Sequence, residues 1–519
     1  MNPFYQFTRF ACVLIAASAL SLTTTIATAT APRPNIILVM ADDMGWGDVG
    51  YNSKTVTYAD GTPHEDRDWI KTPVMDHMAD NGVRFDRFYS ASAVCSPTRF
   101  SCLTGRHPVR GGIGGANTGR LDFDETALSE VLSAEGYATA HLGKWHLGIL
   151  TTERLDGNKG GLEDHFDRYS GPWHHSYDTV FATESKVPTY NPYGNFDYDG
   201  EMDFSNPNLY NDHGTRYWEL PYTGNQISGE GTPVVPDTLF EIATNYTNVA
   251  EDYDGDDSQI LVNRAIPFMQ DAVANNQPFF LVLWFHTPHK PVKDKDDPNA
   301  SANSQNGLKN SIQDMDAAIG RLRTELDTLG VRGDTMLWVT SDNGPENGID
   351  SPTDESNNEA DNTYPRPLRS GRYLDRKGSL YEGGIIVPGI LEWPDVITSG
   401  SSTSMPAVTT DYYPTILDYL QLTVPNQRTL DGISLRPAIE GTSNTRSKPI
   451  IFRLGGDTAL TTNQYKLVNQ NIRNNDHPQH VPGELRLYDM VNIAAGEEPE
   501  QTPLATASNY TTKSQAIQD

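Results

Sequence analysis

The chain contains the stretch Val94-Cys95-Ser96-Pro97-Thr98-Arg99-Phe100-Ser101-Cys102-Leu103-Thr104-Gly105-Arg106. Proline is favoured in the first turn of a helix, where its missing N–H would have no partner in any case. This stretch therefore predicts a helix that begins at Cys95 and runs to Leu103. The free N–H groups and the positive end of the helix dipole favour an anion beside Cys95. Arg99 lies one turn further on, so both side chains are expected to face one site. A buried cysteine in an ordinary helix has the same short pattern.

Two apolar runs, one before and one after this stretch, end in pairs of oxygen-bearing side chains. Residues 35–41 precede Asp42 and Asp43, and residues 335–340 are followed by Asp342 and Asn343. Such runs are typical of buried parallel strands, and ligands of open α/β sheets bind at the carboxyl ends of strands. Adjacent carboxylates there are costly unless a cation or an arginine neutralises them, although a solvated turn has the same sequence. Four oxygen-bearing side chains from two strand ends suit a hard cation.

Further predicted strands lead into titratable side chains. Residues 137–142 lead into Lys144 and His146, and residues 278–285 lead into His286 and His289. For Lys144 and His146, a surface turn is the alternative interpretation. The patterns also predict a strand over 83–89 and helices over 74–81, 127–135, 261–274 and 311–329. Short strands over 448–454 and 464–468 indicate a small antiparallel sheet near the end of the chain.

These motifs together resemble those of a known family. Cys-Ser-Pro-Thr-Arg followed by Leu-Thr-Gly-Arg resembles the sulfatase signature, and so do Gly-Lys-Trp-His-Leu-Gly at 143–148 and Lys-Gly-x-x-x-Glu-Gly-Gly at 377–384. The resemblance covers nearly all of the chain after residue 34 and implies a sulfuric ester hydrolase. The implied fold is an alkaline-phosphatase-like α/β sandwich, in which helices flank a large, mixed, mainly parallel sheet. A small C-terminal sub-domain with an antiparallel sheet would complete it.

The resemblance also implies two cofactors. In sulfatases a formylglycine-generating enzyme oxidises the signature cysteine to formylglycine, an aldehyde whose hydrate is the nucleophile. Residue 95 would carry this group. The implied calcium ligands are Asp42, Asp43, Asp342 and Asn343.

The same resemblance implies roles for five basic residues. Lys144 and Lys377 would contact the sulfate, and Lys144 would also contact the formylglycine. His146 would handle the proton of the nucleophile. His289 would bind sulfate and protonate the leaving oxygen. Arg99 would help to neutralise charge on the sulfuryl oxygens.

The N-terminus predicts export. An apolar run over 10–22 follows Arg9, and the small residues Ala27-Thr28-Ala29 come next, which is typical of a secretory signal peptide spanning residues 1–29. The run is too short to span a membrane. We therefore expect a secreted or periplasmic protein without membrane insertion. After cleavage only Cys95 and Cys102 remain, and a disulfide between them within one helix is geometrically poor.

The net charge of −29 in a chain of 519 residues argues against nucleic acid and anionic membranes as partners. An anionic substrate would need a site that gathers its cations locally. The predicted domains are a catalytic α/β domain over 30–400, with an aromatic-rich insertion at 150–255, and a C-terminal section over 401–519. Within the insertion, His174 and His175 are the candidates for substrate selectivity, although packing is the alternative.

The predicted substrate is a sulfated polysaccharide or its oligosaccharides, such as the algal carrageenan or ulvan. Export, the insertion and the arginines of a polar loop at 345–376 favour this interpretation. Three alternatives stay open. They are an arylsulfatase acting on small phenolic sulfates, a phosphonate or phosphodiester hydrolase of the same superfamily, and a non-catalytic sulfoglycan-binding protein in which Cys95 is unmodified.

Overall fold

The computed structural model describes residues 33–57, 61–150, 166–185, 187, 189, 217–220, 256–297, 304–346, 369–470, 484–493, 498–507 and 509. Three sequence-based predictions fall wholly or mostly outside these residues. They are the signal peptide at 1–29, the insertion at 150–255 and the polar loop at 345–376. No helix within the described ranges is long and apolar enough to cross a membrane.

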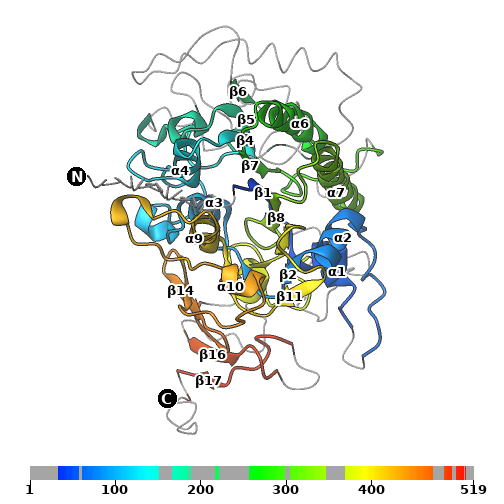
Figure 1. The fold of residues 1–519 in the computed structure, drawn as a ribbon. Coiled ribbons are helices and arrows are strands. Elements are labelled where there is room, and N and C mark those ends of the chain that lie inside the picture. Colours follow the sequence, from blue (N-terminus) through cyan, green and yellow to red (C-terminus); the bar gives the residue numbers. More distant parts are fainter. Residues whose placement is uncertain are drawn as a thin grey trace, which may run out of the picture.

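A mixed nine-stranded sheet forms the centre of the fold (Figure 1), in the order β11-β2-β10-β8-β1-β7-β4-β5-β6. Its strands are β1 (Asn35–Ala41), β2 (Val83–Phe85), β4 (Ala138–Lys144), β5 (Thr179–Thr183), β6 (Trp218–Leu220), β7 (Phe279–Trp284), β8 (Thr335–Ser341), β10 (Ile390–Glu392) and β11 (Ser401–Thr403). Strands β8, β1, β7, β4 and β5 run parallel to one another. Their carboxyl ends therefore meet at one edge of the sheet.

Helices cover both faces of this sheet, which explains why β1 is apolar throughout. Alternate residues of a strand face opposite sides. Ile36, Leu38 and Met40 pack in a core with α3 (Cys95–Thr104), α4 (Leu128–Ala134) and α9 (Tyr412–Tyr419). The residues between them pack in a second core with α2 (Pro73–Asn81), α6 (Ser258–Ala274) and α7 (Gln305–Thr328). In Figure 1 these two groups of helices lie on opposite sides of the sheet.

Two smaller sheets complete the described fold. One has the order β12-β3-β9, and the other is antiparallel with the order β13-β14-β15-β16-β17. Their strands are β3 (Phe88–Tyr89), β9 (Ile386–Val387), β12 (Ala407–Val408), β13 (Ile450–Leu454), β14 (Asp457–Thr461), β15 (Tyr465–Asn469), β16 (Leu485–Asp489) and β17 (Ala505–Thr506). The remaining α-helices are short: α1 (Gly50–Ser53), α8 (Glu382–Ile385) and α10 (Arg436–Ile439). The 3₁₀ helices are η1 (Trp46–Asp48), η2 (Pro108–Gly111), η3 (Phe166–Arg168), η4 (Pro172–His175), η5 (Thr409–Asp411) and η6 (Pro425–Gln427).

The predicted fold class is confirmed: a mainly parallel central sheet lies between helices, and a separate antiparallel sheet follows. The section after residue 400 also supplies β11 to the central sheet and α9 to its helical layer. The division of the chain into domains at residue 400 stays a prediction.

Two predicted elements differ from the structure. The strand predicted over 83–89 is two strands, because a turn at Asp86 and Arg87 sends β2 to the central sheet and β3 to the three-stranded sheet. Helix α6 continues through Pro267. Pro267 lies on the exposed side of α6, where water can bind the carbonyl oxygen that loses its helical donor.

A buried ion cluster between the antiparallel sheet and α8 predicts a pH dependence of stability. Lys466 Nζ lies 2.8 Å from Glu382 Oε1 and 2.7 Å from Glu500 Oε1. Burial, opposed by Lys466 and reinforced by Glu382, raises the pKa of Glu500 from 4.5 to about 7. The folded protein therefore binds this proton more tightly than the unfolded chain, and wild-type stability falls as pH rises between the two values. Glu500→Gln removes this dependence. The difference in free energy of unfolding between the variant and the wild type should therefore shift by about 1–3 kcal/mol in favour of the variant as pH rises from about 5 to about 8. The measurement is the Tm of both proteins at both pH values. A difference in Tm between the two proteins that is the same at both pH values would contradict the prediction.

Candidate active site

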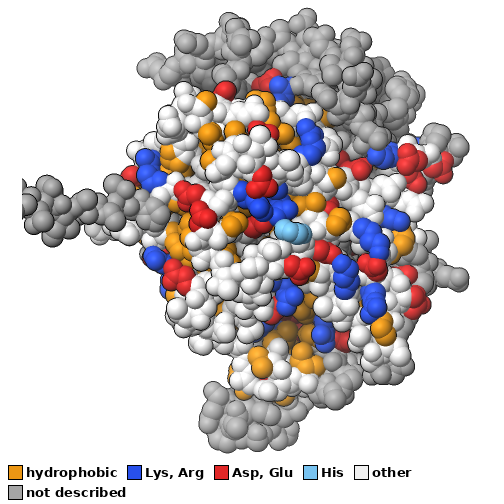
Figure 2. Space-filling view, turned by 45° about the vertical axis from the view of Figure 1, so that its right-hand side comes forward, with side chains coloured by type: hydrophobic (Ala, Val, Ile, Leu, Met, Phe, Trp, Pro, Cys, Tyr) orange, Lys and Arg blue, Asp and Glu red, His pale blue; other side chains and the backbone are white. Residues whose placement is uncertain are grey.

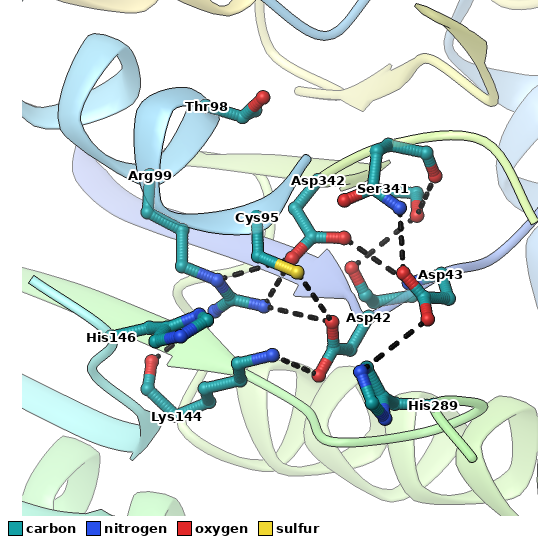
Figure 3. A network of polar contacts seen from close by, with 12 residues as sticks. Asp42, Asp43, Cys95, Thr98, Arg99, Lys144, His146, His289, Ser341 and Asp342 are labelled. Atoms are coloured by element: carbon teal, nitrogen blue, oxygen red, sulfur yellow. Dashed lines mark hydrogen bonds and ion pairs between the residues drawn. The ribbon is translucent and has the colours of Figure 1, made fainter. Parts of the chain in front are cut away.

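Polar side chains converge at the edge of the sheet where the parallel strands end (Figure 3). They lie at or just after the ends of β1, β4, β7 and β8, and α3 begins at the same place. The structure brings together nine of the residues singled out from the sequence, which are Asp42, Asp43, Cys95, Arg99, Lys144, His289, Asp342, Asn343 and Lys377.

Cys95 is the first residue of α3 and is almost completely buried, with 2% of its surface exposed. Its Sγ lies 3.7 Å from Asp42 Oδ1. Burial and the charge of Asp342 raise the pKa of the Cys95 thiol, against the opposing effect of Lys144 and Lys377. The thiolate is the nucleophilic form of cysteine. An unmodified Cys95 is therefore a poor nucleophile in this place.

Each carboxylate of the cluster has a basic partner. Arg99 donates from Nε and Nη2 to Asp342 Oδ2 at 3.1 and 2.7 Å, and its Nη2 lies 3.5 Å from Asp42 Oδ1. Lys144 Nζ donates to Asp42 Oδ2 at 2.6 Å. Against the effect of burial, Asp42 raises the pKa of Lys144, so this lysine is charged. These pairs allow several ionised groups to coexist away from water.

Asp43 has a similar arrangement. Lys377 Nζ donates to Asp43 Oδ2 at 2.7 Å. Burial acts to raise the pKa of Asp43, but the positive charges of Lys377 and Lys144 lower it. Asp43 is therefore a carboxylate, and its backbone has a φ of +66°, an uncommon conformation for a residue other than glycine.

A buried amide oxygen points to a cation site among these carboxylates. Asn343 Nδ2 donates to Asp43 Oδ1 at 2.6 Å and to the carbonyl oxygen of Gly344 at 2.8 Å. Within the described part of the chain, Asn343 Oδ1 is buried and has no hydrogen-bond partner. Burial and the neighbouring Asp42 raise the pKa of Asp342 to about 6, which reflects crowding of negative charge. A hard cation with oxygen ligands would satisfy the amide oxygen and relieve this crowding.

His289 lies beside the ion pair of Lys377 and Asp43. Its Nδ1 donates to the carbonyl oxygen of Lys290 at 2.6 Å. Its Nε2 lies 3.2 Å from Lys377 Nζ and 3.6 Å from Asp43 Oδ2. Burial and the charge of Lys377 lower the pKa of His289 to about 3. The imidazole is therefore neutral, and its Nε2 accepts a hydrogen bond from the ammonium group of Lys377.

His146 follows β4 and lies beside Arg99 and Lys144 (Figure 3). Its Nε2 lies 2.5 Å from Asn117 Oδ1, which accepts a hydrogen bond when Nε2 carries the proton. Sequence reasoning missed Asn117, because it lies in a glycine-rich stretch without periodicity. It also missed Trp284, whose ring lies 5.1 Å from the Arg99 guanidinium, although a tryptophan at a strand end is a weak signal for such a contact.

The two histidines predicted to select the substrate pack against aromatic rings. His175 is fully buried, stacks on Trp145 at 5.9 Å and forms a 3.0 Å hydrogen bond between Nε2 and Ser170 Oγ. In this position the His175 side chain makes packing contacts, and its contact with a substrate stays a prediction. His174 Nδ1 accepts the N–H of Gly171 at 3.0 Å. A substrate contact by the partly exposed His174 stays a prediction.

Two other groups of polar residues are engaged within the protein. His286 is buried, with Nδ1 2.7 Å from Asp257 Oδ2 and Nε2 2.5 Å from Thr183 Oγ1, which indicates a structural role. Arginines at the end of the polar loop also form ion pairs. Arg369 Nη1 lies 2.6 Å from Asp48 Oδ2, and Arg372 Nε lies 2.7 Å from Glu498 Oε2.

Comparisons with known proteins show the family of this chain. The family model described as Sulfatase matches residues 34–422. Human (Homo sapiens) steryl-sulfatase is 30% identical over 454 residues, which cover 81% of this chain and 72% of that protein. N-acetylgalactosamine-6-sulfatase of Mus musculus is 29% identical over 472 residues, covering 88% and 75%. The crystal structure of Ps i-CgsB in complex with k-i-k-neocarrahexaose has the same fold, with a TM-score of 0.60 at 24% identity, over 89% of this chain and 87% of that chain.

Proposed function

Because the chain belongs to the sulfatase family, we propose that it is an exported carbohydrate sulfatase whose nucleophile is a formylglycine made from Cys95. Its family makes it a sulfuric ester hydrolase with the alkaline-phosphatase-like fold. The observation that carries the proposal is the burial of Cys95 at the start of α3, among three carboxylates and three cationic side chains. We further propose that residues 1–29 direct export and that a formylglycine-generating enzyme oxidises Cys95.

The nucleophile is the first element of the proposed chemistry. When hydrated, formylglycine supplies one hydroxyl to attack sulfur and a second whose deprotonation expels sulfate and restores the aldehyde. The raised pKa of the Cys95 thiol supports the need for this modification. Lys144 and Arg99 are charged groups on the Cys95 side of the cluster, and they stabilise negative charge on the nucleophile and the sulfuryl oxygens. His146 takes the proton of the second hydroxyl.

Lys377 and His289 form the second group of proposed sulfate contacts, and a ring nitrogen of His289 lies within 4.8 Å of the Cys95 sulfur. The ammonium group of Lys377 binds a sulfuryl oxygen. In the structure the neutral His289 accepts a hydrogen bond from Lys377. Against the effect of burial, Asp43 raises the pKa of Lys377, so Lys377 keeps its proton and His289 takes its own from solvent. Bound sulfate adds negative charge and favours protonation of His289. The protonated Nε2 then donates to the oxygen of the departing alcohol as the S–O bond breaks.

Asp42, Asp43, Asp342 and Asn343 are the proposed ligands of Ca²⁺. The buried Asn343 Oδ1, which has no hydrogen-bond partner among the described residues, and the crowded carboxylates fit an oxygen-seeking cation. The ion supplies electrostatic stabilisation of negative charge on a sulfuryl oxygen.

The proposed substrate is a sulfated carbohydrate, in particular an algal polysaccharide or its oligosaccharides. One relative is named N-acetylgalactosamine-6-sulfatase, and the structural neighbour Ps i-CgsB was crystallised in complex with a neocarrahexaose. On the face shown in Figure 2, Lys and Arg side chains gather beside a histidine, although the chain has a net charge of −29. The ion pairs of Arg369 and Arg372 weaken the support that the arginines of the polar loop offered.

A small aryl or steroid sulfate is the second candidate substrate, because human steryl-sulfatase is about as similar to this chain as N-acetylgalactosamine-6-sulfatase is. Initial rates with sulfated carrageenan and ulvan oligosaccharides, an aryl sulfate and an aryl phosphonate separate the substrate classes. Turnover of an oligosaccharide with kcat/KM above that of the aryl sulfate supports the carbohydrate. Preferred turnover of the phosphonate would favour the phosphonate hydrolase.

The first experiment is the mass of the peptide that contains residue 95. Trypsin cleaves after Arg87 and Arg99, so this peptide spans residues 88–99. Protein produced with a formylglycine-generating enzyme should yield the aldehyde or its hydrate and release sulfate from an ester. Protein produced without that enzyme should yield the thiol and release none. If active, exported protein contained only the thiol, the proposed nucleophile would be wrong. If the exported protein contained the thiol and bound sulfoglycans without turnover, the binding-protein alternative would be supported.

Calcium should stabilise the protein through Asn343. Asn343→Leu keeps the size of the side chain and removes the oxygen, so the Ca²⁺ concentration for half of the maximal Tm increase should rise about 10-fold or more. Thermal melting across a Ca²⁺ titration measures this change. The matched control is Asn52→Leu, since Asn52 is also buried but donates to the Trp46 carbonyl oxygen. Equal titration curves for both variants would exclude Asn343 as a ligand.

A further inference from the structure

Lys377 reaches the active site from a segment that has no regular secondary structure. A lysine side chain has four rotatable bonds, so the place of its Nζ depends on how firmly the backbone is held. The N–H of Lys377 donates to the carbonyl oxygen of Pro345 at 3.0 Å, and the N–H of Gly378 donates to that of Ala93 at 2.7 Å. These two bonds attach one side of the segment to the neighbours of Asn343 and Cys95.

The other side of the segment is held by one residue of the antiparallel sheet. Gln470 directly follows β15 and is 4% exposed. Its Oε1 accepts hydrogen bonds from the N–H of Leu380 and from Ser379 Oγ, the latter at 3.2 Å. Its Nε2 donates to the carbonyl oxygen of Gly378 at 3.4 Å and to Asp457 Oδ2 at 2.8 Å. The Gln470 amide therefore uses both its acceptor and its donor group on this segment.

The same sheet also holds the residues that follow. Lys466 of β15 contacts Glu382, the first residue of α8, and Arg486 of β16 donates to Tyr381 Oη at 3.1 Å. Helix α8 is in turn attached to the cation site, because the N–H of Gly344 donates to the carbonyl oxygen of Gly384 at 3.0 Å. A Cβ on Gly344 would lie 1.9 Å from the carbonyl oxygen of Gly383, so these segments are in direct contact.

From this arrangement we propose that Gln470 is a positioning residue of the sulfatase reaction, which places Lys377 by clamping residues 378–380. The antiparallel sheet, seen below the central sheet in Figure 1, then serves catalysis without contacting the reacting atoms. This inference rests on the proposed function of Lys377. Residues that orient a contacting group typically affect activity 10- to 100-fold, and small misplacements have effects of similar size.

The test is a double-mutant cycle between Gln470 and Lys377, with kcat/KM for a sulfate ester and Tm measured for each protein. Gln470→Ala should lower kcat/KM about 10- to 100-fold. In a Lys377→Ala background, the same change should lower Tm but cause little further loss of kcat/KM, because its target is already gone. An equal fold-loss in both backgrounds would show a general structural role and overturn the inference. If Lys377→Ala alone left kcat/KM unchanged, the assigned role of Lys377 would fail first.

A second pair of variants covers the case in which Gln470→Ala does not fold. Gln470→Glu keeps the oxygen that accepts from Leu380 and Ser379, but places a carboxylate beside Asp457. Adding Asp457→Asn restores a donor at that contact but not at the carbonyl oxygen of Gly378, so the double variant should regain part of the kcat/KM that Gln470→Glu alone loses. Asp457→Asn by itself leaves the clamp intact and should behave as wild type. Failure of the second change to restore kcat/KM would overturn the inference.

Discussion

Cys95→Ala is expected to lower kcat/KM for sulfate esters by more than about 10⁴-fold, because it removes the atom from which the nucleophile is made. The change should have little effect on Tm. The Cys95 Sγ has a long 3.7 Å contact with Asp42, and the ion pairs of Arg99, Lys144 and Lys377 do not involve the thiol. Initial sulfate release and thermal melting measure the two effects separately.

Cys102 provides a matched control within the same helix. It is fully buried, and burial raises the pKa of its thiol, as it does for Cys95. Cys102 packs in the apolar core between the sheet and α3 rather than at the sheet edge. Cys102→Ala should therefore lower Tm slightly and leave kcat/KM near the wild-type value. If Cys95→Ala retained most of the activity, or if both variants lost it equally, residue 95 would not carry the nucleophile.

The central sheet and its polar edge could be predicted from the sequence, since both depend on local patterns. Residues 35–41 are apolar without alternation because helices cover both faces of β1. Asp42 and Asp43 directly follow this run, so their place at a strand end is a consequence of chain order. The cluster around Cys95 could not be predicted from local patterns alone, because its hydrogen bonds join residues up to 334 positions apart, as between Asp43 and Lys377. Motifs resembling those of a family supplied that information.

The features that the sequence did not predict also have physical explanations. An aromatic ring with a polar tip serves equally well for packing and for binding a sugar, so the sequence around His175 does not distinguish the two uses. Asn117 and Gln470 each act through one side-chain amide, and no periodicity or motif marks either residue. The strand predicted over 83–89 is broken by a turn because its two halves join different sheets, and that choice depends on the partner strands. Long-range pairing of this kind is absent from local patterns.

Arg99→Met should lower the free energy of unfolding by about 3–5 kcal/mol, because it leaves buried carboxylates without their partner. Arg99 is fully buried, donates twice to Asp342 and also donates from Nη1 to the carbonyl oxygen of Lys144 at 3.2 Å. Methionine retains much of the apolar stem but none of the charge. The variant should melt at a lower temperature, and added Ca²⁺ should restore part of the lost Tm, because a cation at the neighbouring ligands offsets the same negative charge.

Arg446 separates stability from catalysis in this comparison. Its buried guanidinium pairs with both oxygens of Asp411, at 2.6 and 2.9 Å. Asp411 belongs to η5 and not to the strand ends that carry the site residues. Arg446→Met should therefore destabilise the protein to a similar degree, without a Ca²⁺-dependent recovery and with wild-type kcat/KM for the folded fraction. Arg99→Met should lower both Tm and kcat/KM, since the charge that it removes also stabilises negative charge on the sulfuryl oxygens. A folded Arg99→Met protein with wild-type kcat/KM would confine the role of this arginine to holding Asp342 in place.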